Sequence, residues 1–307
     1  MKRRKFFRYV WGLGGLFFAA CARPPRPASS ESAVGLDIRN FSADDLRLPE
    51  GDPLLRFVSI ADTGTGATGQ YAVAEAMTAY HQQHAYPLVV MAGDNIYNNG
   101  EIRKIGSVFE QPYQALRDRG VQFHAVLGNH DIRTANGNPQ VAYPEFHMAG
   151  QRYYTFTEGP IQFFALDTNS NADWERQLPW FAQELADSQA PWKVVFGHHQ
   201  IYASGVYGVN EAQWAVRLKE LFNAHQVPLY INGHEHHYER THAIAGTTYL
   251  ICGGGSMTRP VGRSPWTAYS ASQLSFAAYD VFDDLMVVRG IDPGGHVFDQ
   301  GVIPRPV

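Results

Sequence analysis

Short apolar runs recur along this chain, and each of them ends on a carboxylate, an amide or an imidazole. The side chains that follow the runs are Asp62, Asp94, Asn129, His198 and His234. The runs themselves are typical of buried strands. Because parallel strands end at one edge of a sheet, these side chains are expected to gather there, although they are far apart in the sequence.

The order of helices and strands predicts the fold class. Helical periodicity covers 69–84, about 108–119, 174–186 and 211–225, and 133–149 reads as a loop. Strands are predicted over 54–61, 87–92, 122–127, 153–156, 161–166, 192–196, 227–231, 247–252, 276–282, 285–291 and 296–303. Early βαβ units followed by late strands indicate an α/β fold of two packed sheets with helices outside.

Residues 1–21 read as a targeting segment. Lys2 to Arg8 resembles a twin-arginine export signal, and the apolar run from Val10 to Ala20 is too short to span a membrane. Small residues before Cys21 resemble a bacterial lipobox, which predicts a lipid on Cys21 and a periplasmic or cell-surface location. The alternatives are simple cleavage near Ala20 or an uncleaved anchor. One lipid chain attaches a protein to a membrane surface without inserting its domain.

The rest of the chain divides into a tether and one domain. Residues 22–52 are rich in Pro and Ser and read as a flexible tether, and 53–307 reads as a single domain. The net charge is -4 and no basic run follows the targeting segment, so no nucleic-acid groove is expected. Cys21 and Cys252 cannot build a disulfide framework, and Cys252 is expected to be a small buried residue.

Two short motifs have the chemistry of metal ligands. In the first, Gly93 allows a sharp turn, and Tyr97 follows Asp94 by three positions. A carboxylate and a phenolate are hard oxygen ligands that suit a strongly acidic metal ion. In the second, His234 and His236 are spaced by two, so they point the same way from an extended segment.

Taken in order, the motifs resemble those of the calcineurin-like metallophosphoesterase superfamily. The matching segments are Asp62, Gly93-Asp94, Gly128-Asn129-His130-Asp131, Gly197-His198 and Gly233-His234-Glu235-His236. The Gly-Asp-Asn-Ile-Tyr segment that ends on Tyr97 is similar to that of the purple acid phosphatases, including the small tartrate-resistant type. The resemblance spans about 57–255, and it implies a four-layer α/β/β/α fold with two mixed sheets.

The resemblance also implies a site for two metal ions. One ion would be held by Asp62, Asp94, Tyr97 and His236, and the other by Asp94, Asn129, His198 and His234. The family's first metal is Fe(III), and its second is Fe(II), Zn(II) or Mn(II). A phenolate suits a trivalent ion, whereas imidazoles and an amide suit a divalent one. Such a pair clamps a phosphoryl group, and a metal-bound hydroxide is the expected nucleophile.

Further residues are expected to handle the substrate. Asn129 and His130 would contact it, and His130 would stabilise phosphate charge or protonate the leaving alkoxide. Asp131 either orients His130 or only caps the next segment.

Two positions depart from the pattern of the purple acid phosphatases. Tyr207 stands where the family has a second substrate-facing histidine, and His199 stands where the small phosphatases usually have tyrosine. Either His199 takes over the acid role, or Tyr207 supplies a weaker donor, or a gap shifts the alignment.

Two other segments have open roles. His237, Tyr238 and Arg240 either line the pocket or are structural. Gly253 to Gly255 either cradles phosphate or belongs to a loop near packed backbone, and the second reading is favoured.

The expected function is that of a lipid-anchored, metal-dependent acid phosphatase that hydrolyses small phosphate monoesters. One alternative is a phosphodiesterase of the same superfamily, acting on cyclic nucleotides or phospholipid head groups. The other is a surface-binding protein without turnover. The complete ligand set and His130 argue against the last of these.

Overall fold

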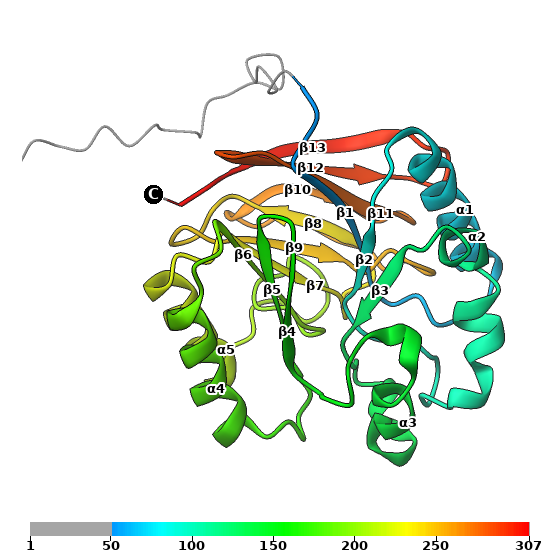
Figure 1. Ribbon diagram of the computed structural model, residues 1–307, viewed down its shortest axis with the longest axis horizontal. Helices are drawn as coiled ribbons and strands as arrows, with labels where there is room; N and C mark the ends of the chain where they lie inside the picture. The colour runs from blue at the N-terminus through cyan, green and yellow to red at the C-terminus, as the bar shows by residue number, and fades with distance from the viewer. Residues whose placement is uncertain (1–50, 307) are drawn as a thin grey trace, which may run out of the picture. The chain divides into compact units, whose positions relative to one another are not determined.

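Two β-sheets packed against each other form the centre of the domain (Figure 1). The computed structural model describes residues 51–306. The predicted targeting segment 1–21 and nearly all of the predicted tether 22–52 therefore lie outside the described residues. Within the described part, no helix is both long enough and apolar enough to cross a membrane.

The first sheet has six strands in the order β13-β12-β11-β1-β2-β3. Strands β1, β2 and β3 are parallel, and β11, β12 and β13 add to β1 as antiparallel neighbours. Their bounds are β1 Leu55–Ile60, β2 Leu88–Met91, β3 Gln122–Ala125, β11 Phe276–Val281, β12 Leu285–Ile291 and β13 Val297–Pro304. The sheet thus joins the start of the domain to its end.

The second sheet has seven strands in the order β10-β8-β9-β7-β6-β5-β4. Strands β5, β6, β7 and β9 are parallel, while β4, β8 and β10 are antiparallel to their neighbours. Their bounds are β4 Tyr154–Glu158, β5 Ile161–Ala165, β6 Trp192–Phe196, β7 Leu229–Asn232, β8 Tyr238–Thr241, β9 Thr248–Cys252 and β10 Thr267–Ala271. Both sheets are mixed, as expected.

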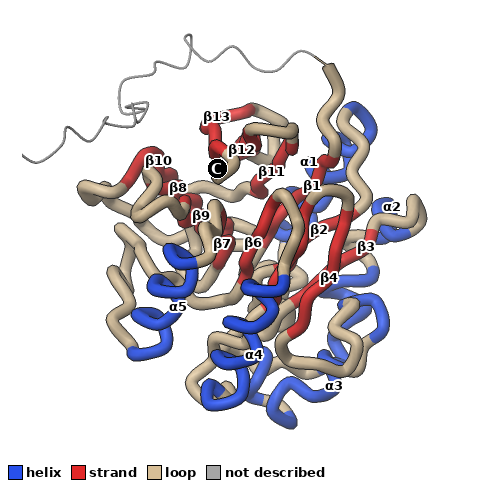
Figure 2. Tube along the Cα trace, turned by 60° about the vertical axis from the view of Figure 1, so that its left-hand side comes forward, coloured by secondary structure: helices blue, strands red, loops and turns tan. Residues whose placement is uncertain are grey.

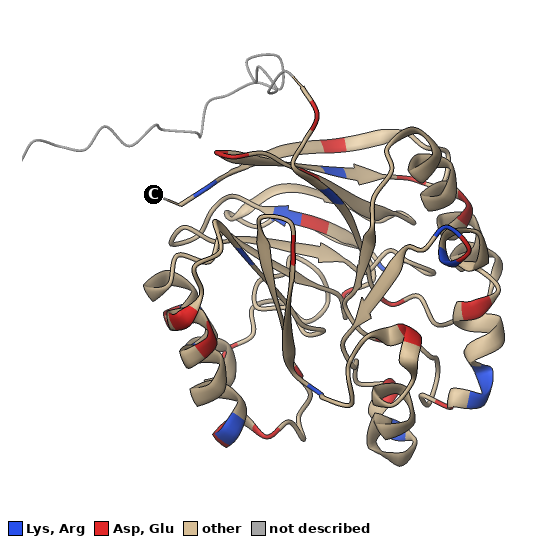
Figure 3. Ribbon diagram, viewed as in Figure 1, with Lys and Arg blue, Asp and Glu red and all other residues tan. Residues whose placement is uncertain are grey.

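Helices flank the two sheets, as the tube in Figure 2 also shows. Their bounds are α1 Thr68–Gln83, α2 Gln114–Arg117, α3 Asn138–Val141, α4 Trp174–Asp187 and α5 Gln213–Ala224. Helices α4 and α5 bury Phe181, Leu218 and Phe222 in a cluster with Val195 and Tyr230 of the second sheet. Lys and Arg are interspersed with Asp and Glu along the helices and strands (Figure 3).

Aromatic rings fill the space between the sheets. Phe57 of β1 stacks on Tyr279 of β11 with ring centroids 4.2 Å apart. It also meets the edge of Phe163, from β5 of the second sheet, at 5.2 Å. Each such ring pair adds about 0.5–1.5 kcal/mol beyond the burial of its area. These contacts fix the distance between the sheets, and so also the geometry of the residues at the strand ends.

A buried ion pair connects the two sheets. Arg240 of β8 donates from Nε and Nη2 to Asp299 of β13, each at 2.8 Å. The hydroxyl of Tyr238 donates to the same carboxylate at 2.8 Å. The sequence left open whether Tyr238 and Arg240 line the pocket or are structural, and these contacts give them the structural role.

Most predicted elements agree with the structure, but one predicted helix and one predicted loop differ from it, and two strands are additional. The helix expected over about 108–119 is instead a π-helical turn, Gly106–Glu110, followed by the short α2, because Pro112 lies between them and lacks an N–H. The loop expected over 133–149 contains short helical turns, namely η4 Asp131–Arg133, η5 Ala135–Gly137, α3 and η6 Pro144–Phe146. Strands β8 and β10 were not predicted.

Candidate metal centre

The carboxyl ends of strands from both sheets meet at one place. Asp62, Asp94 and Asn129 follow β1, β2 and β3 of the first sheet. His198 and His234 follow β6 and β7 of the second sheet, and His236 lies just before β8. The expectation that these strand ends converge is met.

The first group of donor atoms consists of Asp62, Tyr97 and His236. The Tyr97 hydroxyl lies 3.0 Å from Asp62 Oδ1 and 3.2 Å from His236 Nε2. His236 Nε2 in turn lies 3.3 Å from Asp62 Oδ1. Ligand atoms of Asp62, Asp94 and His236 all lie within 4.8 Å of one another. This arrangement could hold one metal ion, and its donors are those that the sequence predicts for the first of the two ions.

The second group surrounds His198. Its Nε2 lies 3.1 Å from Asn129 Oδ1 and 3.6 Å from Asp94 Oδ1. Ligand atoms of His198, His199 and His234 lie within 4.8 Å of one another. Asp94 therefore stands between the two groups, which is where the sequence predicts a bridging carboxylate.

Backbone groups orient several of these side chains. His198 Nδ1 lies 2.9 Å from the carbonyl oxygen of Ala92. A carbonyl oxygen only accepts, so Nδ1 donates, and Nε2 is left facing the oxygen atoms of Asn129 and Asp94, where a metal ion would lie. Asp62 Oδ2 accepts from the backbone N–H of His234 at 2.9 Å.

Three of the candidate ligands have backbone angles that are rare for residues with a side chain. The φ angles of Asp62, Asp94 and His234 are 57°, 54° and 70°. Such left-handed conformations cost on the order of 1–3 kcal/mol each, and they persist where the surrounding structure imposes them. They occur here at the sharp turns that aim side chains from strand ends into the site.

Close backbone packing leaves no room for a side chain at two motif glycines. A Cβ on Gly128 would lie 2.1 Å from Asp94 Oδ1, and one on Gly253 would lie 2.0 Å from the carbonyl oxygen of Glu235. This result supports the favoured reading of Gly253 to Gly255 as a loop near packed backbone.

The charges of the site suit bound cations. Asp62 and Asp94 are buried, and no Lys or Arg in the described part of the chain pairs with them. Burial alone would raise the pKa of Asp62, but its hydrogen bond to His236 and the nearby histidines hold that pKa below its ordinary value. Burial, and then the charge of His198, lowers the pKa of His234 to about 3. Buried carboxylates beside a neutral imidazole are donors that a metal ion can neutralise and bind.

His130 lies at the mouth of the site. Its Nδ1 is 2.8 Å from the carbonyl oxygen of Asn98, and its ring centroid is 4.6 Å from that of Tyr97. Its Nε2 is 3.9 Å from Asp94 Oδ2 and 3.3 Å from a guanidinium nitrogen of Arg133. The ring is partly exposed, which leaves it accessible to a ligand.

Asp131 does not orient His130, and that expectation is wrong. Its carboxylate accepts from the backbone N–H groups of Gly128, Asn95 and Ile96 at 2.7, 3.1 and 3.0 Å. Gln140 donates to it at 3.0 Å. Because its oxygens are engaged by these groups, Asp131 joins the loop after β2 to the loop after β3 and is a positioning residue.

Thr168 determines how His199 is presented, a role that the sequence analysis missed. The Thr168 hydroxyl oxygen accepts from the backbone N–H groups of His198 and His199 at 3.1 and 3.0 Å. Its own hydrogen is then left for His199 Nδ1, at 2.9 Å. Neutral His199 therefore carries its proton on Nε2. Burial, and then the charges of His198 and His234, lower the pKa of His199 well below its ordinary value.

Tyr207 lies next to the candidate ligand His234. Its ring stacks on that of His234 with centroids 4.4 Å apart, and half of the residue is exposed. Its backbone N–H donates to the buried Glu235 at 2.5 Å. His237, whose role was left open, lies buried between Glu235 and Glu239.

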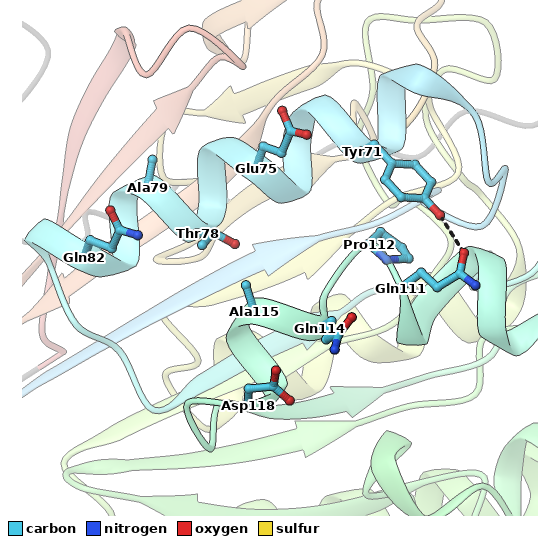
Figure 4. A pocket seen from close by; sticks show the side chains of 10 residues that line it. All are labelled: Tyr71, Glu75, Thr78, Ala79, Gln82, Gln111, Pro112, Gln114, Ala115 and Asp118. Atoms are coloured by element: carbon cyan, nitrogen blue, oxygen red, sulfur yellow. Dashed lines mark hydrogen bonds between the residues drawn. The ribbon is translucent and has the colours of Figure 1, made fainter.

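A separate groove lies between α1 and the segment around α2. This open groove of about 460 Å³ is lined by α1 and by the segment around α2 (Figure 4). Tyr71 and Gln111 are hydrogen-bonded across it at 3.3 Å. None of the candidate ligands lines the groove, so the cluster at the strand ends remains the candidate functional site.

Comparison with known proteins gives a consistent result. The family model described as calcineurin-like phosphoesterase matches residues 55–238. The chain is 28% identical to purple acid phosphatase 7 of Arabidopsis thaliana, over 71% of this chain and 75% of that protein. It is 25% identical to purple acid phosphatase 17 of the same plant, over 77% of this chain and 84% of that protein.

Solved structures share the fold, and two examples show the degree of similarity. The purple acid phosphatase PPD1 from yellow lupin seeds superposes with a TM-score of 0.70 at 18% identity, over 82% of this chain and 54% of that chain. GAP50, described as the anchor in the inner membrane complex of Plasmodium, superposes with a TM-score of 0.71 at 22% identity. The match covers 82% of this chain and 89% of that chain.

Proposed function

This chain belongs to the calcineurin-like phosphoesterase family, and we propose that it is a dinuclear-metal phosphatase that hydrolyses phosphate monoesters. A metal-dependent phosphoesterase follows from the family and from the two clusters of candidate ligands. The dinuclear site, its metals and the preference for monoesters are the steps that this proposal adds.

One observation carries the proposal. Two groups of donor atoms share Asp94, whose Oδ1 is 3.6 Å from His198 Nε2, while its ligand atom lies within 4.8 Å of those of Asp62 and His236. Each group has the donors for one ion. The phenol of Tyr97 and the carboxylates suit Fe(III), whereas His198, His234 and the amide of Asn129 suit Fe(II), Zn(II) or Mn(II).

The residues of the site would then divide the work of hydrolysis. Bound metal ions supply Lewis-acid activation of the phosphate ester. His130 would protonate the leaving alkoxide from Nε2 of its doubly protonated ring, since Nδ1–H is donated to the carbonyl oxygen of Asn98. His199 would donate its Nε2–H to a phosphoryl oxygen without transferring the proton, because burial keeps the ring neutral. Asn129 would contact the same group.

The direct test is phosphate release by the metal-loaded protein from matched esters. We expect turnover of phenyl phosphate to exceed that of bis-phenyl phosphate, and metal analysis to find two ions per chain. A preference for the diester would identify the phosphodiesterase alternative instead. Metal binding without release of phosphate from either ester would favour the non-catalytic alternative.

Two variants examine the metal assignment. Asp94→Asn should release both ions, because the variant removes the shared negative charge. If Tyr97 binds Fe(III), the oxidised protein absorbs visible light and Tyr97→Phe loses that absorption. A fully metal-loaded wild-type protein that is colourless and free of iron contradicts the iron assignment.

The location of the protein is a separate proposal, which rests on the sequence of residues 1–21. We expect the protein to be exported and attached to a membrane through Cys21. Cys21→Ser should move it from the membrane fraction to the soluble fraction, and an unchanged distribution contradicts the lipid anchor.

A further inference from the structure

Arg259 is an arginine without a carboxylate partner beside the metal centre. It lies between β9 and β10 and is half-buried. The other half-buried arginines of residues 51–306 all pair with a carboxylate. They are Arg56 and Arg289 with Asp280, Arg117 with Glu145, Arg152 with Asp167, and Arg240 with Asp299. No carboxylate in this part of the chain lies within ion-pair distance of Arg259, so its charge is available to a ligand.

The backbone around Arg259 is fixed to the metal centre. Its N–H donates to the carbonyl oxygen of His236 at 2.7 Å. Its own carbonyl oxygen accepts from the Ser272 hydroxyl at 2.7 Å. Because both the N–H and the carbonyl group of Arg259 are hydrogen-bonded, its side chain starts from a defined position next to His234 and His236.

An aromatic platform supports the guanidinium. Its central carbon lies 5.8 Å from the centroid of the Tyr207 ring, and that ring stacks on His234 at 4.4 Å. A guanidinium nitrogen also donates to the carbonyl oxygen of His234 at 3.4 Å. A guanidinium has five N–H donors, so donors remain for a ligand after this one contact.

A cation held beside a site for metal cations needs an anion to offset the repulsion. The scissile phosphate is the anion that the metal ions are proposed to bind, and Arg259 contacts the backbone of His234 and the ring of Tyr207 that stacks on His234. A guanidinium in such a position recognises carboxylates and phosphates through paired hydrogen bonds. The exposed half of Tyr207 offers apolar surface to the part of a ligand that lies between the two anionic groups.

We propose that Arg259 and Tyr207 form a subsite for the leaving group, and that preferred substrates are phosphate monoesters whose leaving group carries a second anionic group, either a carboxylate or a further phosphate. This inference rests on the proposed function. It also gives Tyr207 a role at the position where the family has a second substrate-facing histidine.

A pair of non-hydrolysable ligands tests the subsite without requiring turnover. The pair is 4-carboxyphenylphosphonate and its neutral amide, 4-carbamoylphenylphosphonate, measured by calorimetry with metal-loaded protein. We expect the wild-type protein to bind the carboxylate about tenfold more tightly than the amide, the ratio of one charge-assisted contact. Arg259→Gln should reduce the ratio to about one, and Arg259→Lys should give an intermediate ratio.

Arg263→Gln is the matched control. Arg263 lies in the same segment, is exposed and donates to the carbonyl oxygen of Ala268 at 2.9 Å. This variant removes one positive charge as well, and we expect it to keep the wild-type ratio. A bisphosphonate, 1,4-phenylenebisphosphonate, then shows whether the second group is better a phosphate than a carboxylate.

The outcomes separate this inference from the proposed function. Equal ratios in the wild-type protein and Arg259→Gln would overturn the subsite, as would a wild-type protein without preference for either anionic ligand. Should Arg259→Gln fold poorly, Tyr207→Leu replaces it, since it removes the platform from an exposed position. Preferential binding of the anionic ligand, combined with no phosphate release from 4-carboxyphenyl phosphate, would support the subsite while the proposed phosphatase activity failed.

Discussion

The hydroxyl of Thr168 sets the proton on His199, and its loss has a specific cost. Thr168→Val keeps the shape of the side chain but removes the acceptor of two backbone N–H groups and the donor to His199 Nδ1. We expect phosphate to inhibit the variant about 10- to 100-fold more weakly, because one hydrogen bond to a charged group contributes about 1.5–3 kcal/mol. Inhibition constants for inorganic phosphate measure this change.

Thr168→Ser is the control for that prediction, since serine retains the hydroxyl. We expect it to restore most of the phosphate affinity. If the Ser and Val variants bind phosphate equally, the hydroxyl does not set the state of His199. Metal content should be measured in both variants, because a loss of metal would also weaken phosphate binding.

At the residue scale, sequence order located the positions that lie at strand ends. The convergence of Asp62, Asp94 and Asn129 follows from the parallel strands of one sheet, which end at one edge, whereas His198 joins them from the second sheet. The partners of Asp131 could not be read in this way, because its carboxylate binds backbone N–H groups, which every sequence contains. Arg259 was missed because its neighbours Tyr207 and His234 come from other segments.

At the scale of strands, the link between β8 and β13 is expected to stabilise the pairing of the sheets. Asp299→Ala leaves the guanidinium of Arg240 buried without its partner. We expect a loss of about 3–5 kcal/mol in the free energy of unfolding, the usual cost of breaking a buried pair. Urea denaturation measures it, and the turnover of the folded variant should not change.

A double variant separates the charge from the packing. Asp299→Leu combined with Arg240→Met replaces both partners by apolar groups of similar size, so no charge is left buried. This variant should be more stable than Asp299→Ala. The opposite order would show that the pair itself, and not the stranded charge, supplies the stability.

Strand β3 contains a histidine that should make the protein sensitive to acid. His124 stacks on Phe156 at 3.7 Å, and burial, then the charge of His147, lowers its pKa to about 3. The folded state favours the neutral ring, so this stability is complete above the ordinary pKa of 6.5 and is lost as the pH falls towards 3. At pH 5 the loss is about 2 kcal/mol by linkage.

His124→Phe should therefore lose less stability than the wild-type protein between pH 7 and pH 5. Urea midpoints at the two pH values give the comparison, and the difference between the proteins removes the contribution of other groups. An equal decrease of the urea midpoint in both proteins would mean that protonation of His124 does not destabilise the folded state.

The burial of each strand explains which strands could be predicted from the sequence. Apolar runs identified β1, β2, β6 and β12 because these strands are buried on both faces. Strand β10 was missed because its burial is mostly partial, so its sequence lacks a continuous apolar run. Strand β8 was missed because it directly follows the histidine motif and contains the charged Glu239 and Arg240.

For the whole molecule, the candidate metal centre connects the two sheets, because its candidate ligands come from both. Asp62, Asp94 and Asn129 come from the first sheet, and His198 and His234 come from the second. Bound metal should therefore hold the sheets together. At free metal a thousandfold above Kd the gain is about 4 kcal/mol, so a chelator should lower Tm, and re-addition of metal should restore it. The same chelator should leave Tm of Asp94→Asn unchanged.

The position of β1 has a consequence for the order of events during synthesis. Its neighbour β2 follows soon after it, with Phe57 opposite Leu88. Its other neighbour is β11, with Leu55 opposite Val281, so β1 remains an open edge until most of the chain has been translated. Contacts so distant in sequence form late in folding. Asp62 directly follows β1, so the strand that positions this candidate ligand is paired on both sides only after β11 has been translated.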